Sequence, residues 1–502
     1  MRAPVSTSPA REAAVLLVGK VLGTLSEALV PLVIVRLWGK ADVGVVASAQ
    51  LTYAAISTIL QAGFPEAATF YLPGRPGPER RAIAGVVAKT LFGVGGLTAL
   101  VLLALTGAAA LFGSQSGWAE GATLLPYFAA LALVDLPSRM ATNVLVAEGR
   151  AGTTAGLGVL RALGASAATL VPAVAGASAL EVVVSTCAFG FVFGLGTLAV
   201  LARHYAREAR APSPISAREV VRFSVPFGLT EIASIANAQL DRYLVLWWFA
   251  AATFADYQAG AWQVPMIGAI PHIISVAYTP RFVVWFREGR RADVLESWRR
   301  LAARTALLVT PLSAIFVVGA EETMRLLFTD AYGGSASVFR LFSIFMMLRV
   351  TPYGNLLLAA GRPDLITRAS FLAVLSNAAL TIPCIALIGL DGAALGTLLA
   401  FLPTAAYYCF GIAEVMGTRF REVYPLGAHL RVLALVAVSA LPAIAVKIWL
   451  PVGPGVALLL EAAALLVTFA ALGTAAGLVE RGDWATVRSW VSARVRRGSP
   501  AT

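Results

Sequence analysis

The chain has 502 residues, of which 58% are hydrophobic and only 13% are charged. A soluble chain of this length would carry about a quarter charged residues to cover its surface. The composition therefore excludes a soluble globular protein. Apolar runs of about 20 residues recur along the chain, and each is long enough to cross a bilayer as a helix. The net charge of +12 is explained by arginines that face anionic lipid headgroups, so no nucleic-acid partner is expected.

Taken in chain order, the apolar runs predict an all-α polytopic membrane protein with about fourteen transmembrane helices. The first run is too long for the core of a signal peptide, so we expect it to stay in the mature protein. The predicted spans lie near residues 13–35, 43–63, 82–111, 122–147, 153–175, 181–202, 223–249, 255–278, 303–325, 337–360, 366–389, 392–413, 432–450 and 455–478.

Basic residues are concentrated on one side of these predicted helices. If the N-terminus is cytoplasmic, the opposite side carries only Arg36 and Lys40, with Arg325 near a helix end. The positive-inside rule then predicts that the N- and C-termini are both cytoplasmic. The connections on the cytoplasmic side contain, among others, Arg80, Arg81, Arg150, Arg210, Arg218, Arg222, Arg290, Arg291, Arg362, Arg419 and Arg431.

One phrase of the sequence occurs twice. The segments NVLVAEGR (143–150) and NLLLAAGR (355–362) share five of eight residues at an offset of 212. A local explanation is that Gly149 and Gly361 each end a helix before an interfacial arginine. However, the same offset aligns the first predicted span with the seventh and the second with the eighth. In addition, AATLVP (167–172) aligns with AALTIP (378–383) at an offset of 211.

This agreement favours a duplicated six-helix unit, whose two copies share one orientation because six is even. We therefore expect two pseudo-symmetric halves followed by two additional helices and a basic cytoplasmic tail. The predicted boundaries are 1–210, 211–415, 416–480 and 481–502.

Charged residues inside the predicted spans are the candidate functional residues, because exposing them to lipid is costly. We take seven basic and five acidic residues of the spans as candidates, and this excess of basic residues favours an anionic substrate; the planar guanidinium suits phosphate. The candidate substrate-binding residues are Arg139, Arg161, Arg349, Arg242, Lys20 and Lys89. The candidate ion or proton carriers are Asp135, Glu27, Glu231 and Asp241.

Several in-span charges also have a purely structural explanation. Lys20, Lys89 and Arg340 can reach an interface with their long side chains. Lys20 and Glu27 are seven residues apart on one face, and Glu461 lies outside the repeat, where we expect a structural role.

Two pairs of residues need separate treatment. Asp135 and Arg139 are four residues apart on one helix face, so they can form an ion pair. This pair is either structural, or functional, with Arg139 binding the substrate and Asp135 releasing it or carrying the coupling ion. Asp241 and Arg242 are adjacent and point in different directions. Arg161 and Arg349 have no acidic residue in their own spans, so we expect both to contact a diphosphate.

Four further segments resemble the polysaccharide transporters of the multidrug/oligosaccharidyl-lipid/polysaccharide exporter superfamily. They are RLWGKADVGVVASAQ (36–50) with the following Gly63-Phe64-Pro65 turn, QLDRYLVLWWF (239–249) followed by Tyr257 and Ala259, MRLLFTDAY (324–332) and GLDGAALGT (389–397). The resemblance implies a flippase of the bacterial cytoplasmic (inner) membrane with a cationic central cavity. Such proteins move undecaprenyl-diphosphate-linked oligosaccharides to the outer leaflet by alternating access.

The resemblance also implies the partners: a lipid-diphosphate-linked oligosaccharide and membrane lipids, with a polysaccharide polymerase and glycosyltransferases as candidate protein partners. We expect no cofactor and no metal. The sequence shows no nucleotide site, so an H⁺ or Na⁺ gradient, or the substrate gradient, is the expected source of energy.

Three alternatives remain. A lipid II flippase shares the helix count, but that family carries cavity bases on helices 1, 2 and 8, and predicted spans 2 and 8 contain no Lys or Arg. Multidrug exporters usually need acidic sites for cationic drugs. A membrane glycosyltransferase, polymerase or ligase usually has a long external loop, whereas the external connections near 112–121 and 326–336 have about ten residues. Because P-loop, HExxH and GxSxG motifs are also missing, we expect the protein not to be an enzyme.

Overall fold

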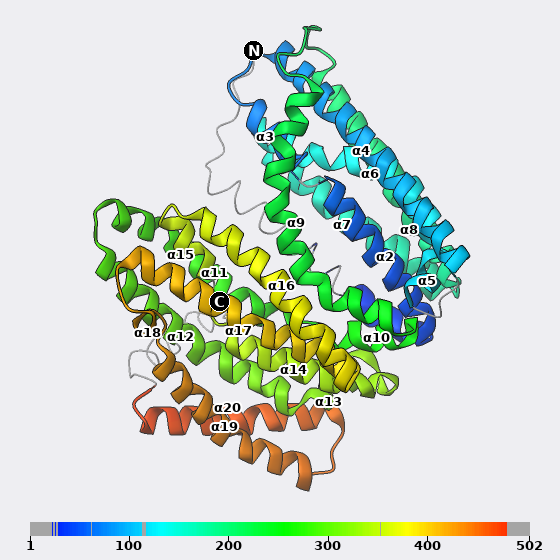
Figure 1. Cartoon of the computed structure of the whole chain (residues 1–502). Coiled ribbons are helices and arrows are strands. Elements are labelled where there is room, and N and C mark those ends of the chain that lie inside the picture. The colour runs from blue at the N-terminus through cyan, green and yellow to red at the C-terminus, as the bar shows by residue number, and fades with distance from the viewer. Residues whose placement is uncertain are drawn as a thin grey trace, which may run out of the picture. The chain divides into compact units, whose positions relative to one another are not determined.

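The computed structural model describes residues 23, 26, 29–61, 63–112, 117–351 and 353–478, without some of their side chains. These residues form helices and short connections (Figure 1). Twelve helical segments among them are long and apolar enough to cross a membrane. The predicted class of all-α polytopic membrane protein is confirmed.

The predicted number of fourteen spans is not confirmed. The span predicted at 13–35 lies mostly outside the described residues. The span predicted at 223–249 forms α9 (Ala217–Trp248), which carries Glu231, Asp241 and Arg242 and is not among the twelve apolar segments.

The chain packs as two compact units, Met1–Gln258 and Ala259–Thr502. The core of the first unit lies where α2, α4, α6 and α8 meet and includes Leu102, Leu125, Leu136 and Val183. Besides α9, the helices described in this unit are α2 (Lys40–Gln61), α3 (Glu66–Tyr71), α4 (Gly77–Phe112), α5 (Gly117–Ala122), α6 (Leu125–Ala147), α7 (Ala151–Val174), α8 (Ala179–Tyr205) and α10 (Ala251–Gly260), which extends two residues past the boundary.

Small residues allow some of these helices to approach closely. A Cβ added to Gly44 of α2 would stand 1.9 Å from the carbonyl oxygen of Ala251, at the start of α10. Since lipid offers no hydrophobic drive for helix association, such close backbone contacts contribute much of the packing in membranes.

The second unit contains the remaining helices. One part of its core surrounds Trp298, Tyr353 and Leu365, and another packs α12 against α19 and α20. The helices are α11 (Pro265–Arg287), α12 (Arg291–Val318), α13 (Ala320–Phe328), the short 3₁₀ helix η1 (Asp330–Ser335), α14 (Ala336–Leu348), α15 (Tyr353–Ala359), α16 (Pro363–Ile388), α17 (Leu390–Met416), α18 (Phe420–Val423), α19 (Leu426–Trp449) and α20 (Pro454–Ala475).

Two predicted spans are interrupted in the structure. The span predicted at 255–278 is divided into α10 and α11, because Pro265 restricts Val264 to an extended conformation (φ −62°, ψ 107°) and begins a new helix. The span predicted at 337–360 is divided into α14 and α15. Arg349 leaves the helical conformation at ψ 52°, three residues before Pro352 in the sequence.

The helix boundaries repeat at the offset found in the sequence. α7 begins at Ala151 and α16 begins at Pro363, 212 residues later. The packing partners repeat as well: α6 contacts α7 and α8 in the first unit, while α15 contacts α16 and α14 contacts α17 in the second. The boundary predicted after residue 210 remains a prediction, since the compact units divide after Gln258.

The duplicated phrase forms the same helix end twice. Gly149 and Gly361 have φ of 70° and 72°, the left-handed conformation that glycine adopts without strain. The amide of Arg150 donates to the carbonyl of Leu145 at 2.8 Å, and the amide of Arg362 donates to that of Leu357 at 2.9 Å. Both are Schellman caps followed directly by arginine.

Candidate substrate-binding site

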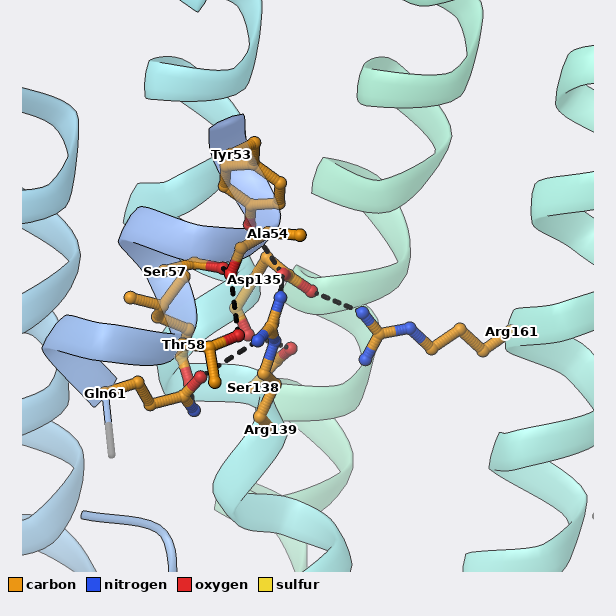
Figure 2. Close-up of polar contacts among 10 residues, drawn as sticks. Tyr53, Ala54, Ser57, Thr58, Gln61, Asp135, Ser138, Arg139 and Arg161 are labelled. Carbon is orange, nitrogen blue, oxygen red and sulfur yellow. Dashed lines mark hydrogen bonds and ion pairs between the residues drawn. The ribbon is translucent and has the colours of Figure 1, made fainter. Parts of the chain in front are cut away.

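The first unit contains a polar cluster inside its apolar helices (Figure 2). Asp135 lies on α6, with Tyr53 on α2 and Arg161 on α7 reaching it from either side. The side chain of Asp135 is only 7% exposed. A buried carboxylate needs charged or hydrogen-bonding partners, so its surroundings decide what the cluster can do.

Asp135 accepts hydrogen bonds on both carboxylate oxygens. Arg139 donates to Oδ2 through Nη2 at 2.6 Å and through Nε at 3.1 Å, and the Tyr53 hydroxyl donates to the same oxygen at 2.7 Å. Arg161 Nη2 donates to Oδ1 at 2.9 Å. The predicted Asp135–Arg139 ion pair is therefore present, with a second arginine on the same carboxylate.

The pairing of Arg161 corrects one step of the sequence argument. Arg161 has no acidic residue in its own helix, but the neighbouring helix α6 supplies Asp135 across the interface. Sequence spacing reports only neighbours along one helix, so this contact was not predictable from it. The proposed substrate role of Arg161 remains a proposal.

The two arginines differ in how much of each guanidinium is already bonded. Arg139 uses Nε and both terminal nitrogens, because Nη1 also donates to Gln61 Oε1 at 3.0 Å, and its side chain is 27% exposed. Arg161 uses one nitrogen and is 46% exposed. Of the two, Arg161 has more N–H groups available for an anion.

Asp241 and Arg242 point to different partners, as their adjacent positions predicted. Asp241 is 4% exposed, and its Oδ2 accepts a hydrogen bond from the Tyr257 hydroxyl at 2.6 Å. Arg242 Nη1 donates to Gln239 Oε1 at 2.9 Å.

The remaining candidates are not brought into the cluster. Lys89 is exposed on α4, and its ammonium makes no ion pair with the described residues. Lys20 and Glu27 lie outside the described residues, and the side chain of Glu231 is not among those described.

Arg349 lines a separate pocket within the second unit. This pocket of about 370 Å³ lies beside the two helix interruptions and is bounded by Gln263, His272, Arg349 and Thr351 together with apolar side chains. Among the described residues, the Arg349 guanidinium lies 6.0 Å from the centroid of the Phe345 ring and has no carboxylate partner. A cation beside neutral polar groups in a pocket is suited to an anionic ligand.

Several residues of these sites were not singled out from the sequence. Tyr53, Ser57 and Gln61 are spaced four apart on α2, and this polar stripe in an apolar helix was a usable signal. Gln263 and Thr351 line the pocket because the helices are interrupted beside them. In the sequence, only the neighbouring Pro265 and Pro352 indicated these interruptions.

Comparison with protein-family models shows the family to which the chain belongs. The family model described as polysaccharide biosynthesis protein matches residues 10–286, which is more than half of the sequence. The chain belongs to this polysaccharide biosynthesis protein family. A search of the curated proteins finds no match.

Solved structures show the fold that the chain shares. One is the lipid II flippase MurJ in an inward closed conformation, with a TM-score of 0.65 and 12% identity over 93% of this chain and 99% of that one. Another is an inward-facing multidrug resistance MATE transporter of the MOP superfamily, with a TM-score of 0.56 and 16% identity over 84% and 96%. A MOP transporter from Pyrococcus furiosus matches with a TM-score of 0.50 and 14% identity over 82% and 96%. The chain is an integral membrane protein with the MOP transporter fold.

Proposed function

We propose that this protein is a flippase for undecaprenyl-diphosphate-linked oligosaccharide, acting by alternating access in the bacterial cytoplasmic membrane with both termini inside. The product would be an exported polysaccharide such as O-antigen, capsule or exopolysaccharide. Membership of the polysaccharide biosynthesis protein family supports the oligosaccharide, and the MOP fold supports transport rather than enzymatic chemistry.

The observation that carries the proposal is the surplus of arginine in the membrane helices. Asp135 is shared by Arg139 and Arg161, which leaves the cluster with one net positive charge. Arg349 adds a cation that has no carboxylate partner among the described residues. Such charges are costly in a bilayer and are retained where an anion passes.

The structure suggests distinct roles for the arginines. Arg161 and Arg349 would contact the diphosphate, since a guanidinium donates parallel hydrogen bonds to phosphate oxygens. Arg139 would hold Asp135 in place and so orient Arg161. Arg242, Lys20 and Lys89 stay as further proposed contacts, and Glu27, Glu231, Asp135 and Asp241 as proposed carriers of a coupling H⁺ or Na⁺.

The first prediction tests the diphosphate contact. In proteoliposomes, Arg161→Ala and Arg349→Ala should each slow transbilayer movement of the lipid-linked oligosaccharide tenfold or more, because losing a hydrogen bond to a charged group costs about 1.5–3 kcal/mol. Lys at either position should rescue poorly, since the planar fork is lost. The measurement is the fraction of fluorescent lipid-linked oligosaccharide that becomes accessible at the opposite leaflet.

Arg300→Ala is the matched control. Arg300 is 68% exposed and pairs only with Glu296 among the described residues, so its loss should leave the rate unchanged. Full movement by the Arg161→Ala/Arg349→Ala double variant would remove both residues from the site. Movement of lipid II without movement of the oligosaccharide would instead identify a peptidoglycan-precursor flippase.

A further inference from the structure

A buried carboxyl group in the second unit has no partner that accounts for a charge. Glu461 lies in the N-terminal half of α20 and is 1% exposed. Both of its carboxyl oxygens are buried, and neither makes a hydrogen bond within the described part of the chain. This environment is unfavourable for an ionised carboxylate, because the charge would lose its hydration and gain no hydrogen bond or counter-charge in exchange.

The carboxyl group occupies space left by a glycine. A Cβ on Gly319, at the bend between α12 and α13, would stand 2.9 Å from Glu461 Oε2 and 2.5 Å from a methyl carbon of Leu458. Gly319 has φ of −87°, which any residue can adopt, so space rather than backbone conformation favours glycine here. The packing of α20 against this bend therefore holds the carboxyl group in a fixed place.

The charged groups around Glu461 already balance one another without it. Lys447 on α19 bonds to Glu322 Oε2 at 3.0 Å and to Glu321 Oε2 at 3.3 Å. Arg340 on α14 lies 3.4 Å from Glu321 Oε1. Two cations thus face two carboxylates. Residues 305–318 of α12, which also packs against α20, contain no charged residue.

We infer that Glu461 is a proton-binding site and that its carboxyl group is protonated in this conformation. A neutral acid fits the burial, the missing partners and the balanced charges around it. A metal ion fits less well, because no group of three or more acidic, His or Cys side chains in the described part of the chain is arranged to hold one. Lys447, held by two other carboxylates and by the carbonyl of Val318 at 3.3 Å, is not free to neutralise it.

The site links the proton to helix packing. Glu461 can ionise only if Lys447 moves to it or water enters between α13 and α20. Lys447 is the one cation among the described residues whose charge acts on it, and Arg325 of α13 pairs instead with Asp330. Loss of the proton would therefore accompany a rearrangement of these contacts. This inference does not depend on the nature of the transported substrate.

The test is infrared difference spectroscopy of the purified protein in lipid vesicles. A protonated carboxyl group gives a C=O band above the amide I band, and this band shifts in D₂O. We expect such a band near neutral pH in the wild-type protein, its loss in Glu461→Gln, and its disappearance at high pH. Glu322→Gln is the control, because Glu322 is ion-paired and should contribute no such band.

A carboxylic acid band whose intensity is unchanged in Glu461→Gln, or the absence of any carboxylic acid band in the wild-type protein, would overturn the inference. Gly319→Ala gives an independent readout if Glu461→Gln folds poorly. It keeps every carboxyl group but places a methyl group near Oε2, so the band assigned to Glu461 should change frequency. An unchanged frequency would place the carboxylic acid elsewhere.

Discussion

At the scale of single residues, Asp135 is the centre of the first unit's polar cluster. Its four donors come from Tyr53, Arg139 and Arg161, which lie on three helices (Figure 2). A carboxylate that is fully bonded in this way holds its helices in register. To carry a coupling ion, it would have to exchange one of these donors.

The second prediction separates these roles. Asp135→Asn leaves Arg139 and Arg161 without a counter-charge, so membrane abundance should fall. Because both guanidinium groups are partly exposed, the destabilisation should stay below the ~3 kcal/mol of a fully buried pair. The Asp135→Asn/Arg139→Gln double variant restores the original net charge and should insert normally. We expect it still not to transport, because Arg161 has lost its orienting partner.

Membrane abundance and glycan export should be measured for both single variants and the double variant. Arg139→Gln alone should lower abundance less than Asp135→Asn, since Arg161 still neutralises the carboxylate. Recovery of export by the double variant would show that the pair is scaffolding, and both residues would leave the proposed site.

At the scale of helices, the C-terminal caps show which features of the repeated phrase arise locally. The Schellman cap at Gly149 recurs at Gly361 and also at Gly289, where the amide of Arg290 donates to the carbonyl of Trp285 at 2.9 Å. Gly289 lies outside the duplicated phrase. The recurrence shows that Gly-Arg at a helix end arises locally, so the duplication rests on the repeated helix boundaries rather than on this motif.

The third prediction concerns these caps. Gly149→Ala and Gly361→Ala should each destabilise the protein by about 1–2 kcal/mol, the cost of a left-handed conformation for a residue with a Cβ. Neither added Cβ meets another atom within 4 Å, so the two costs should be similar. Thermal unfolding of the detergent-solubilised protein measures the effect.

Gly152→Ala and Gly354→Ala are the matched controls. Both glycines are helical and have open space around the added Cβ, so alanine should leave stability unchanged or raise it. A loss of stability in the controls equal to that in Gly149→Ala would show that the left-handed backbone conformation is not the cause of the loss.

Sequence reasoning predicted the helices better than their interruptions and contacts. Hydropathy located α4, α6, α7, α8 and α16 to within a few residues because each is one continuous apolar run. It joined α10 to α11, and α14 to α15, because hydropathy does not register a break inside an apolar run. The Asp135–Arg161 contact and the isolation of Glu461 depend on packing between helices, which no spacing along one helix reveals.

At the scale of the whole molecule, the repeat in helix boundaries and packing partners is the main observation. Helices α6, α7 and α8 have counterparts in α14–α15, α16 and α17. An even number of spans per copy gives both copies the same orientation. Arg150 and Arg362 should then face the same side of the membrane.

The fourth prediction tests that orientation. Reporters fused after Arg210, Arg290 and Arg488 should be cytoplasmic, and one after Gln115 should be external, because arginines concentrate on the cytoplasmic side. Gln115 and Arg488 lie outside the described residues, so this experiment also covers segments that the structure leaves out. Opposite locations for the reporters at 210 and 290 would contradict both the span assignment and the duplication.

The Gly-Arg caps at Gly149 and Gly361 also bear on how the protein adapts to bilayers of different thickness. At Arg150 and Arg362 the charged anchor follows the last helical turn without a spacer. A helix with a longer charged overhang can slide along the membrane normal, whereas these ends would be held at the headgroup boundary. Hydrophobic mismatch would then be absorbed by tilt, or at the opposite ends of α6 and of the span formed by α14 and α15. Lipid composition would therefore act on the side of the membrane away from the caps.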